Sequence, residues 1–154
     1  MATYYTDRTT IGTAGNTSTY IPARVDGRGL VWQAFSITIG TALATNDIIQ
    51  LVTIPAGATI LDGLIGSGGT QGANSDSTFK VGDGSDDDRF LTTTQGIVLR
   101  SGGGIARFNP TAVLTGLNYT YTSEDTIDLT VSAQGTGQTT GGYVKGYVLY
   151  SMDN

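Results

Sequence analysis

The chain has 154 residues and a net charge of −5; glycine is abundant, at 23 residues, and charged side chains are scarce, at 14%. It contains no His and no Cys, so it lacks two common catalytic and metal-binding side chains and has no disulfide framework. With only eight Lys and Arg residues, it is a poor candidate for nucleic-acid binding. No apolar run approaches the ~20 residues of a membrane span. We therefore expect no enzyme activity, no cofactor, and neither nucleic acid nor membrane as a partner.

The first 29 residues differ from the rest of the chain. They contain few large aliphatic side chains and many Thr, Gly, Asn and Ser residues. Such a composition is typical of a disordered tail, but Tyr4, Tyr5 and Tyr20 weaken that interpretation. We predict an extended N-terminal arm over residues 1–29 that becomes ordered against a partner subunit. Residues 30–154 then form one β-sandwich domain. The N-terminus shows no secretory signal, so we expect synthesis in the cytoplasm.

Strand patterns begin at Leu30. Residues 30–39 alternate apolar and polar side chains, which is the pattern of a half-buried strand. Residues 48–54 are nearly all apolar, which predicts a central strand covered on both faces. A Pro-Ala-Gly turn at 55–57 leads to a strand over 59–65. A polar loop over 66–76 and a short strand over 78–81 follow.

The second half continues in the same style. We predict strands over residues 96–100, 113–114, 119–122, 127–131 and 143–151, separated by glycine-rich loops. A short segment over 105–108 is closed by Pro110. Eight or nine short strands, with almost no helix-forming run, indicate an all-β fold. We expect an antiparallel β-sandwich of jelly-roll type.

The densest charge cluster is the acidic loop at residues 83–88, which carries Asp83, Asp86, Asp87 and Asp88. Several carboxylates on a glycine turn are possible ligands of Ca²⁺, which prefers oxygen donors. The spacing does not match an EF-hand, because no Glu stands at the twelfth position. We favour a solvated, structural hairpin, in which the Asp side chains cap their own backbone amides and pair with Arg89.

No other motif selects a catalytic site. The glycine-rich runs at 66–69 and 101–104 lack the Gly-Lys-Ser/Thr ending of a phosphate-binding loop, and no Ser has a His to serve as its base. The aromatic side chains of the strands are candidates for a sugar-binding face or, more commonly, for subunit contacts. Together with the arm tyrosines, the predicted interface residues are Tyr4, Tyr5, Tyr20, Trp32, Tyr143, Tyr147 and Tyr150.

The segment from residue 54 to residue 90 carries a resemblance to a known group of proteins. It contains IPAGATI at 54–60, Gly63, FKVGDG at 79–84 and DRF at 88–90. These runs resemble small structural proteins of tailed-bacteriophage virions, encoded near the major capsid gene. The resemblance extends over about residues 30–150 and rests on overall pattern. The arm has no counterpart in it.

The resemblance implies a head decoration (cement) protein that binds the major capsid protein on the outer capsid surface and stabilises the head. It also implies self-association, and we expect a homotrimer because capsid lattices offer threefold positions. Many small contacts repeated over a lattice give high avidity. The alternative is a tail or head-fibre module that binds a host-surface glycan, since a tyrosine-lined β-sandwich suits either role.

Overall fold

The computed structural model describes residues 3–5, 23–25, 28–39, 43–68, 77–96, 99, 104–108, 115–135 and 142–152. Within these ranges the chain forms strands and one short helix. The elements are β1 (Thr3–Tyr5), β2 (Ala23–Val25), β3 (Arg28–Ile39), β4 (Ile48–Ile54), β5 (Ala58–Gly68), β6 (Thr78–Gly82), α2 (Thr93–Gly96), β7 (Gly104–Arg107), β8 (Asp125–Ala133) and β9 (Gly142–Met152).

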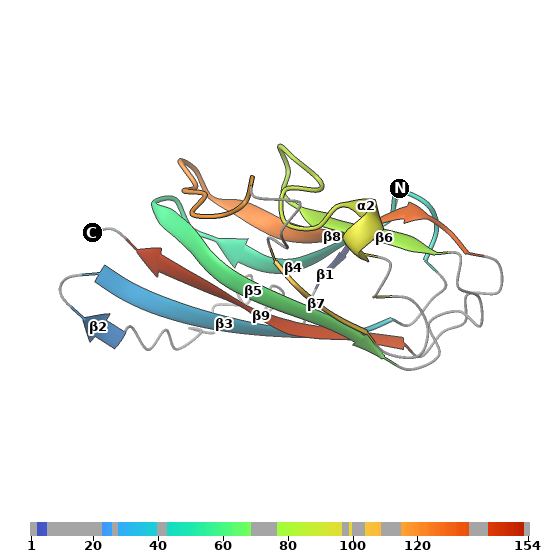
Figure 1. The fold of residues 1–154 in the computed structure, drawn as a ribbon, viewed down its shortest axis with the longest axis horizontal. Helices are drawn as coiled ribbons and strands as arrows, with labels where there is room; N and C mark the ends of the chain where they lie inside the picture. Colours follow the sequence, from blue (N-terminus) through green and yellow to red (C-terminus); the bar gives the residue numbers. More distant parts are fainter. Residues whose placement is uncertain are drawn as a thin grey trace.

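The strands form two sheets that lie one above the other (Figure 1). One sheet has the order β1-β4-β8-β6, and the other has the order β2-β3-β9-β5-β7. From β3 to β9, successive strands alternate between the two sheets. All pairs are antiparallel except β1 with β4. The expected all-β sandwich is therefore confirmed, whereas its assignment as a jelly roll stays a prediction.

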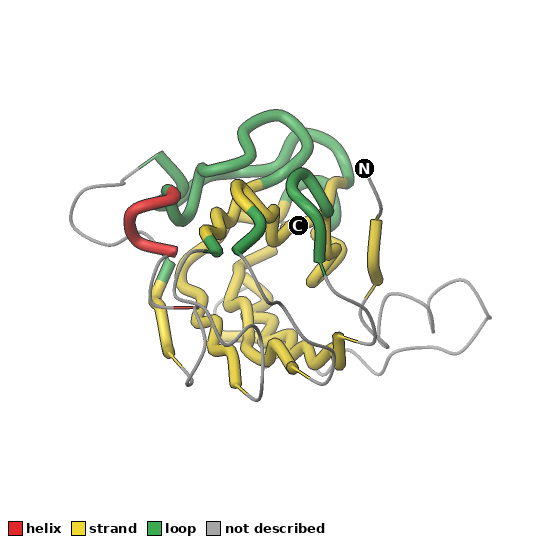
Figure 2. Tube along the Cα trace, turned by 90° about the vertical axis from the view of Figure 1, so that its right-hand side faces the viewer, coloured by secondary structure: helices red, strands yellow, loops and turns green. Residues whose placement is uncertain are grey.

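Loops and turns gather on the side of the four-stranded sheet. The segments 83–92 and 115–124 lie along the upper side of Figure 1, whereas β3, β9 and β5 lie along the lower side. Figure 2 shows the same division from a second direction, with the loops in green above the strands in yellow. The 115–124 segment reaches the five-stranded sheet at the start of β5, where Thr120 forms a bridge with Thr59.

Period-two alternation explains how the strands fill the core. In β8, Ile127, Leu129 and Val131 are buried toward the other sheet, which is the arrangement that their alternation predicts. In β3, the buried residues Val31, Phe35, Ile37 and Ile39 again share one face, with Gln33 half-buried among them. The largest fully buried side chains are Tyr150, Phe79, Phe90, Ile49, Leu51, Ile54, Ile60, Ile65, Leu91, Leu99, Ile127 and Leu129.

The strand pairs of the described residues contain three register shifts, one of them between Thr78 and Phe79, and the other two correct the alternation where the sequence breaks it. Ile60 and Ile65 are both fully buried, although an odd separation puts two residues on opposite faces of a regular strand. The pairing of β5 with β9 shifts between Ile60 and Asp62, so one extra residue restores both side chains to the core. A second shift between Gln50 and Val52 accounts for consecutive buried residues in β4.

Local sequence signals also determine the turn after β4 and the start of helix α2. Gly57 has a φ of 83°, which favours glycine, and the Ala58 amide donates to the Pro55 carbonyl at 3.2 Å. The predicted strand over 96–100 is wrong at both residues that the structure describes there, because Gly96 ends α2 and Leu99 has a 3₁₀ conformation. The backbone amide of Thr92 donates to Gln95 Oε1 at 2.8 Å, which is half of a capping box. No helix in the described part of the chain is long and apolar enough to cross a membrane.

The two described parts of the N-terminal arm add edge strands to the chain's own sheets. β1 pairs in parallel with β4, and β2 pairs with β3. The predicted boundary at residue 29 falls inside β3, which begins at Arg28. The predicted ordering of the arm against a partner subunit stays a prediction. Tyr20 lies outside the described residues, and so do the side chains of Tyr4 and Tyr5.

Candidate functional site

The outward side of the five-stranded sheet, here called the outer face, is the most exposed apolar surface that the structure describes. Strand register defines it, because residues paired directly across strands share a face. Trp32 pairs with Leu149, Ala34 with Tyr147, and Leu64 with both Tyr147 and Arg107. The face comprises Leu30, Trp32, Ala34, Ser36, Thr38, Thr59, Asp62, Leu64, Gly66, Gly68, Ile105, Arg107, Tyr143, Lys145, Tyr147, Leu149 and Ser151.

Most of the large apolar side chains that the described residues expose are on this face. Trp32 and Ile105 are each 69% exposed, and Tyr143 and Leu30 are exposed as well. Leu117, which is also exposed, is in the loop before β8 and not on this face. Trp32 packs edge-on against Tyr147, with 5.7 Å between ring centroids. Single exposed apolar side chains are ordinary, but several on one sheet face mark an interaction surface.

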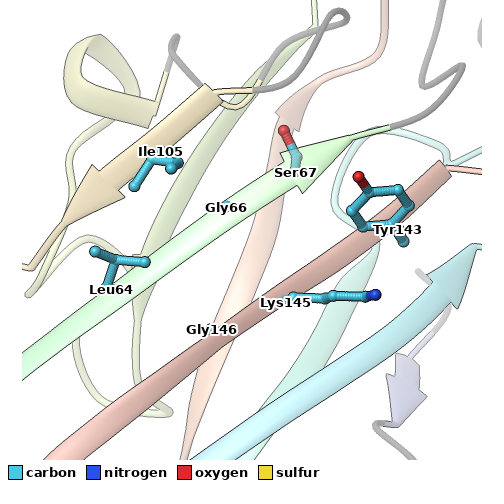
Figure 3. A pocket seen from close by; sticks show the side chains of 7 residues that line it. All are labelled: Leu64, Gly66, Ser67, Ile105, Tyr143, Lys145 and Gly146. Atoms are coloured by element: carbon cyan, nitrogen blue, oxygen red, sulfur yellow. The ribbon is translucent and has the colours of Figure 1, made fainter.

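A shallow groove of about 310 Å³ crosses the part of the outer face where β9, β5 and β7 lie side by side. Figure 3 shows Ile105 on one side of the groove and Tyr143 and Lys145 on the other. The floor between them is low because it contains Gly66. A Cβ added at Gly66 would make ordinary contacts of 3.4 Å or more, so glycine is not required there for packing. It leaves room above the sheet.

The charged side chains of the outer face are few and partly neutralised. Arg107 Nε donates to Asp62 Oδ1 at 2.8 Å, and Arg107 Nη2 donates to Asp62 Oδ2 at 2.9 Å. This bidentate pair raises the pKa of Arg107. Lys145 Nζ lies 4.8 Å from the centre of the Tyr143 ring. The face is thus apolar with a slight excess of positive charge, although the chain has a net charge of −5.

The structure divides the predicted interface residues. Trp32, Tyr143 and Tyr147 share the outer face, but Tyr150 is 0% exposed and belongs to the core. Tyr150 is therefore wrong as an interface residue of this fold. The reason is parity: residues 143 and 147 are an even number apart, whereas residue 150 follows 147 by three and points inward. Sequence reasoning missed Ile105, Leu64 and Lys145, which the same alternation places outward.

The acidic loop is built around a buried carboxylate, that of Asp83. Its Oδ1 accepts hydrogen bonds from the amide of Ser85 at 3.0 Å and the amide of Asp86 at 2.9 Å. Its Oδ2 accepts one from Arg89 Nε at 2.5 Å. Burial alone raises the pKa of Asp83, but these hydrogen bonds outweigh it and hold the pKa below its usual range. Asp83 thus makes the contacts that the hairpin interpretation predicts, but it is buried and not solvated.

Two tyrosines from the loop before β8 complete this cluster. The Tyr121 hydroxyl donates to Asp83 Oδ2 at 3.0 Å, and the guanidinium of Arg89 lies 3.8 Å from the centre of the Tyr119 ring. Burial, followed by the charge of Asp83, raises the pKa of Tyr121. The same loop is tied to β5, because the Tyr121 amide donates to the Ala58 carbonyl at 2.9 Å. The cluster therefore joins the acidic loop, the 115–121 loop and the start of β5.

The other acidic side chains of the loop have different basic partners, although Asp86 and Asp88 are hydrogen-bonded to each other, and burial together with this neighbour raises the pKa of Asp88. Asp87 pairs with Lys80, Asp86 approaches Arg89 at 3.8 Å, and Asp88 is exposed. Across the described ranges, no group of three or more acidic side chains is arranged to hold a metal ion. The absence of Ca²⁺ binding stays a prediction.

Asp128 is a second buried carboxylate, in the middle of the four-stranded sheet. It is only 8% exposed, and its Oδ1 has no hydrogen-bond partner. The pKa of Asp128 is raised to about 6, first by burial; a hydrogen bond with Thr126 opposes the rise, and repulsion from Asp125 and Asp83 adds to it. Nothing in the sequence distinguishes this Asp, because it occupies a polar position of a regular alternating strand.

Comparison with known proteins identifies similar folds but no sequence family. No family model matches the chain, and no curated protein matches it. A chain in the capsid of Ralstonia phage GP4 aligns with a TM-score of 0.74 and 16% identity, over 99% of each chain. A chain of the cyanophage Pam1 capsid asymmetric unit aligns with a TM-score of 0.68 and 21% identity, over 88% of this chain and 94% of the other.

A third match is weaker in geometry. A chain in the acid-stable capsid of the Helicobacter pylori bacteriophage KHP30 aligns with a TM-score of 0.54 and 16% identity, over 82% of this chain and 94% of the other. At such identities the likeness concerns the fold alone. The shared fold is nearly complete in length, since these chains are covered over more than nine-tenths of their residues.

Proposed function

We propose that this chain is a structural protein of a phage virion that decorates the outer surface of the head and stabilises it. The observation that carries the proposal is the end-to-end similarity of fold to a chain in a phage capsid structure, over 99% of both chains. The sequence resemblance at residues 54–90 points to the same class of protein. The first observation concerns the whole backbone, whereas the second concerns the residue pattern of one segment.

The physical properties of the chain suit this role. A decoration protein needs no catalytic group, and the chain contains no His and no Cys. Its net charge of −5 favours solubility as free subunits before assembly. The outer face supplies an apolar surface for a protein partner, and the proposed partners are the major capsid protein and further copies of this chain. A trimer fits threefold positions of a capsid lattice.

Deletion of the gene tests the proposal. Particles without the protein are expected to assemble and package DNA, but to lose that DNA at a lower temperature than wild-type particles. Complementation with the wild-type gene is the control and is expected to restore heat resistance. Deletion particles that resist heat as well as wild type would contradict the decoration role.

One observation favours a second candidate, a module that binds a host-surface glycan. Trp32 is 69% exposed and packs against Tyr147, and exposed aromatic rings stack on apolar sugar faces. The deletion experiment separates the two candidates. Particles that keep full heat resistance but fail to adsorb to cells would replace the decoration role with the glycan-binding role.

A further inference from the structure

The size of the outer face is sufficient for a subunit interface. β5 and β9 each have eleven residues, so the face is about 35 Å long at about 3.3 Å per residue. Its three long strands β3, β9 and β5, spaced about 4.8 Å apart, give a width of about 15 Å, and the four residues of β7 widen it over part of its length. The resulting footprint of roughly 500–600 Å² approaches the ~800 Å² per partner of a standard interface.

The charges of the face favour a second copy of this chain as the partner. Two copies with a net charge of −5 each repel one another unless they meet where negative charge is low. Asp62 is the carboxylate of the outer face, and Arg107 neutralises it through two hydrogen bonds. The side chain of Lys145 adds a positive charge beside the groove. Close approach of two copies therefore costs less here than at the acidic loop.

The same face carries both a projecting side chain and a groove able to receive one. Trp32 projects from β3, whereas the groove lies among β9, β5 and β7. Its volume of about 310 Å³ is at the lower end of ligand pockets, which suits one large side chain. Leu64 and Ile105 would contact the indole, and the Lys145 ammonium would approach the ring face.

We propose that the chain associates with itself by inserting Trp32 of one copy into the groove between Ile105 and Tyr143 of a second copy. Because β3 and β7 lie on opposite sides of the face, copies arranged around an axis bring the β3 side of one face against the β7 side of the next. Such head-to-tail contacts form closed rings when the rotation closes. The contact itself does not depend on capsid binding. Only its ring size rests on the proposed decoration function.

The first experiment measures the mass of the purified full chain by sedimentation and light scattering over a range of concentrations. Wild type is expected to be oligomeric. Trp32→Ala and Ile105→Lys are each expected to raise the dissociation constant about tenfold or more, as for central aromatic contacts of interfaces. Leu117→Ala is the matched control: it truncates an exposed apolar side chain away from the face and is expected to leave the mass unchanged.

The second experiment uses the absence of cysteine from the chain. A chain with Trp32→Cys is mixed with one carrying Ile105→Cys, and mild oxidation is expected to give the mixed disulfide between the two copies. A mixture of the Leu117→Cys and Ile105→Cys chains is the control and is expected to give far less. Circular dichroism verifies that each variant keeps the strand content of wild type, so that loss of association is not loss of folding.

Three results would overturn the proposal. A monomeric wild type means that no second copy occupies the face. An oligomeric wild type whose mass is unaffected by Trp32→Ala and Ile105→Lys places the contact elsewhere on the chain. If wild type is monomeric and the Trp32→Ala variant fails to bind heads, the outer face binds the capsid and not a second copy. In that last case, the heat-resistance test of the decoration function still gives its own independent answer.

Discussion

The acidic loop and the outer face differ in how well the sequence indicates which side chains remain free to bind a partner. The acidic loop, residues 83–88, is the densest charge cluster of the chain. Its central carboxylate, Asp83, is nevertheless buried and accepts hydrogen bonds from neighbouring amides, Arg89 and Tyr121. The outer face is made of ordinary alternating strands, yet it leaves Trp32 and Ile105 mostly exposed. The central charge of the loop is paired within the subunit, whereas the apolar side chains of the outer face remain exposed.

The difference teaches which features to regard as sites. A buried charge costs free energy unless it is paired. The carboxylates of an acidic cluster are therefore often paired with groups of their own loop. An exposed apolar surface costs free energy until a partner covers it. The unsatisfied region, and not the most charged one, is therefore the better candidate for function. Substitutions in the loop should affect the stability of the subunit, whereas substitutions on the outer face should affect association.

The largest effect on stability is expected from Asp83→Asn. Removing the charge leaves Arg89, whose side chain is only 12% exposed, without its partner, and breaking a buried pair costs about 3–5 kcal/mol. Because the pKa of Asp83 is lowered from 3.8, its contribution is present above pH 3.8 and is lost as the pH falls through the lower folded-state pKa. Urea unfolding at pH 7 and at pH 3 measures both effects.

Asp87→Asn is the matched control for that substitution. It makes the same chemical change in the same loop, but its pair with Lys80 is solvent-exposed, and such pairs contribute about 0–1 kcal/mol. An equal loss of stability in the two variants would contradict the view that Asp83 organises the loop.

Asp128→Asn is expected to raise the free energy of unfolding near neutral pH, whereas Asp83→Asn lowers it. The folded-state pKa of Asp128 is raised from 3.8 to about 6, so the folded state binds more protons between these values. Wild-type stability from this group is therefore fully present below pH 3.8 and is lost as the pH rises through about 6. A shift of this size is worth up to about 3 kcal/mol, less any solvent screening.

The Asp128→Asn variant should gain about 1–3 kcal/mol over wild type at pH 7.5 and very little at pH 4. Urea unfolding at closely spaced pH values tests this, with Asp87→Asn again as the reference. A gain that is the same at both pH values would show that packing, and not titration of this carboxylate, is responsible.

A smaller loss is expected from Tyr121→Phe. The substitution removes the hydroxyl that donates to Asp83 Oδ2 at 3.0 Å, but leaves the bond from Arg89 in place, so we expect a loss of about 1–2 kcal/mol. Tyr119→Phe is the control, because the ring keeps its contact with Arg89. Combining Tyr121→Phe with Asp83→Asn should cost less than the sum of the two. Strict additivity would argue against a shared network.

Much of the fold was predictable because the strands obey period-two alternation. The runs around Ile127 and Val148 correctly predicted β8 and β9. The bulges were not predictable, since a single extra residue is seen only in the pairing. The helical turn at Thr93–Gly96 did have a signal, namely Thr92 followed three residues later by Gln95. The apolar residues after it suggested a strand instead.

The outer face was only half predictable. Aromatic composition drew attention to Trp32, Tyr143 and Tyr147, and the structure unites them on one sheet. Ile105 joins them only because β7 pairs with β5, a long-range pairing that no local pattern specifies. The unpaired Oδ1 of Asp128 depends in the same way on what surrounds the strand. Local alternation thus assigns side chains to faces, whereas tertiary pairing decides which faces become sites.

The smallest expected effect is that of removing Ca²⁺. Asp83, the best-placed carboxylate of the acidic loop, already accepts bonds from two amides and Arg89, so adding a chelator should leave the melting temperature unchanged. A site occupied at 100 times its dissociation constant would contribute about 2.7 kcal/mol, which corresponds to several degrees in a domain of this size. Calorimetry with free chelator, and with chelator already saturated by Ca²⁺ as the control, resolves such a shift. A clear drop with free chelator alone would identify the loop as a metal site, and would make both regions of the molecule dependent on a partner.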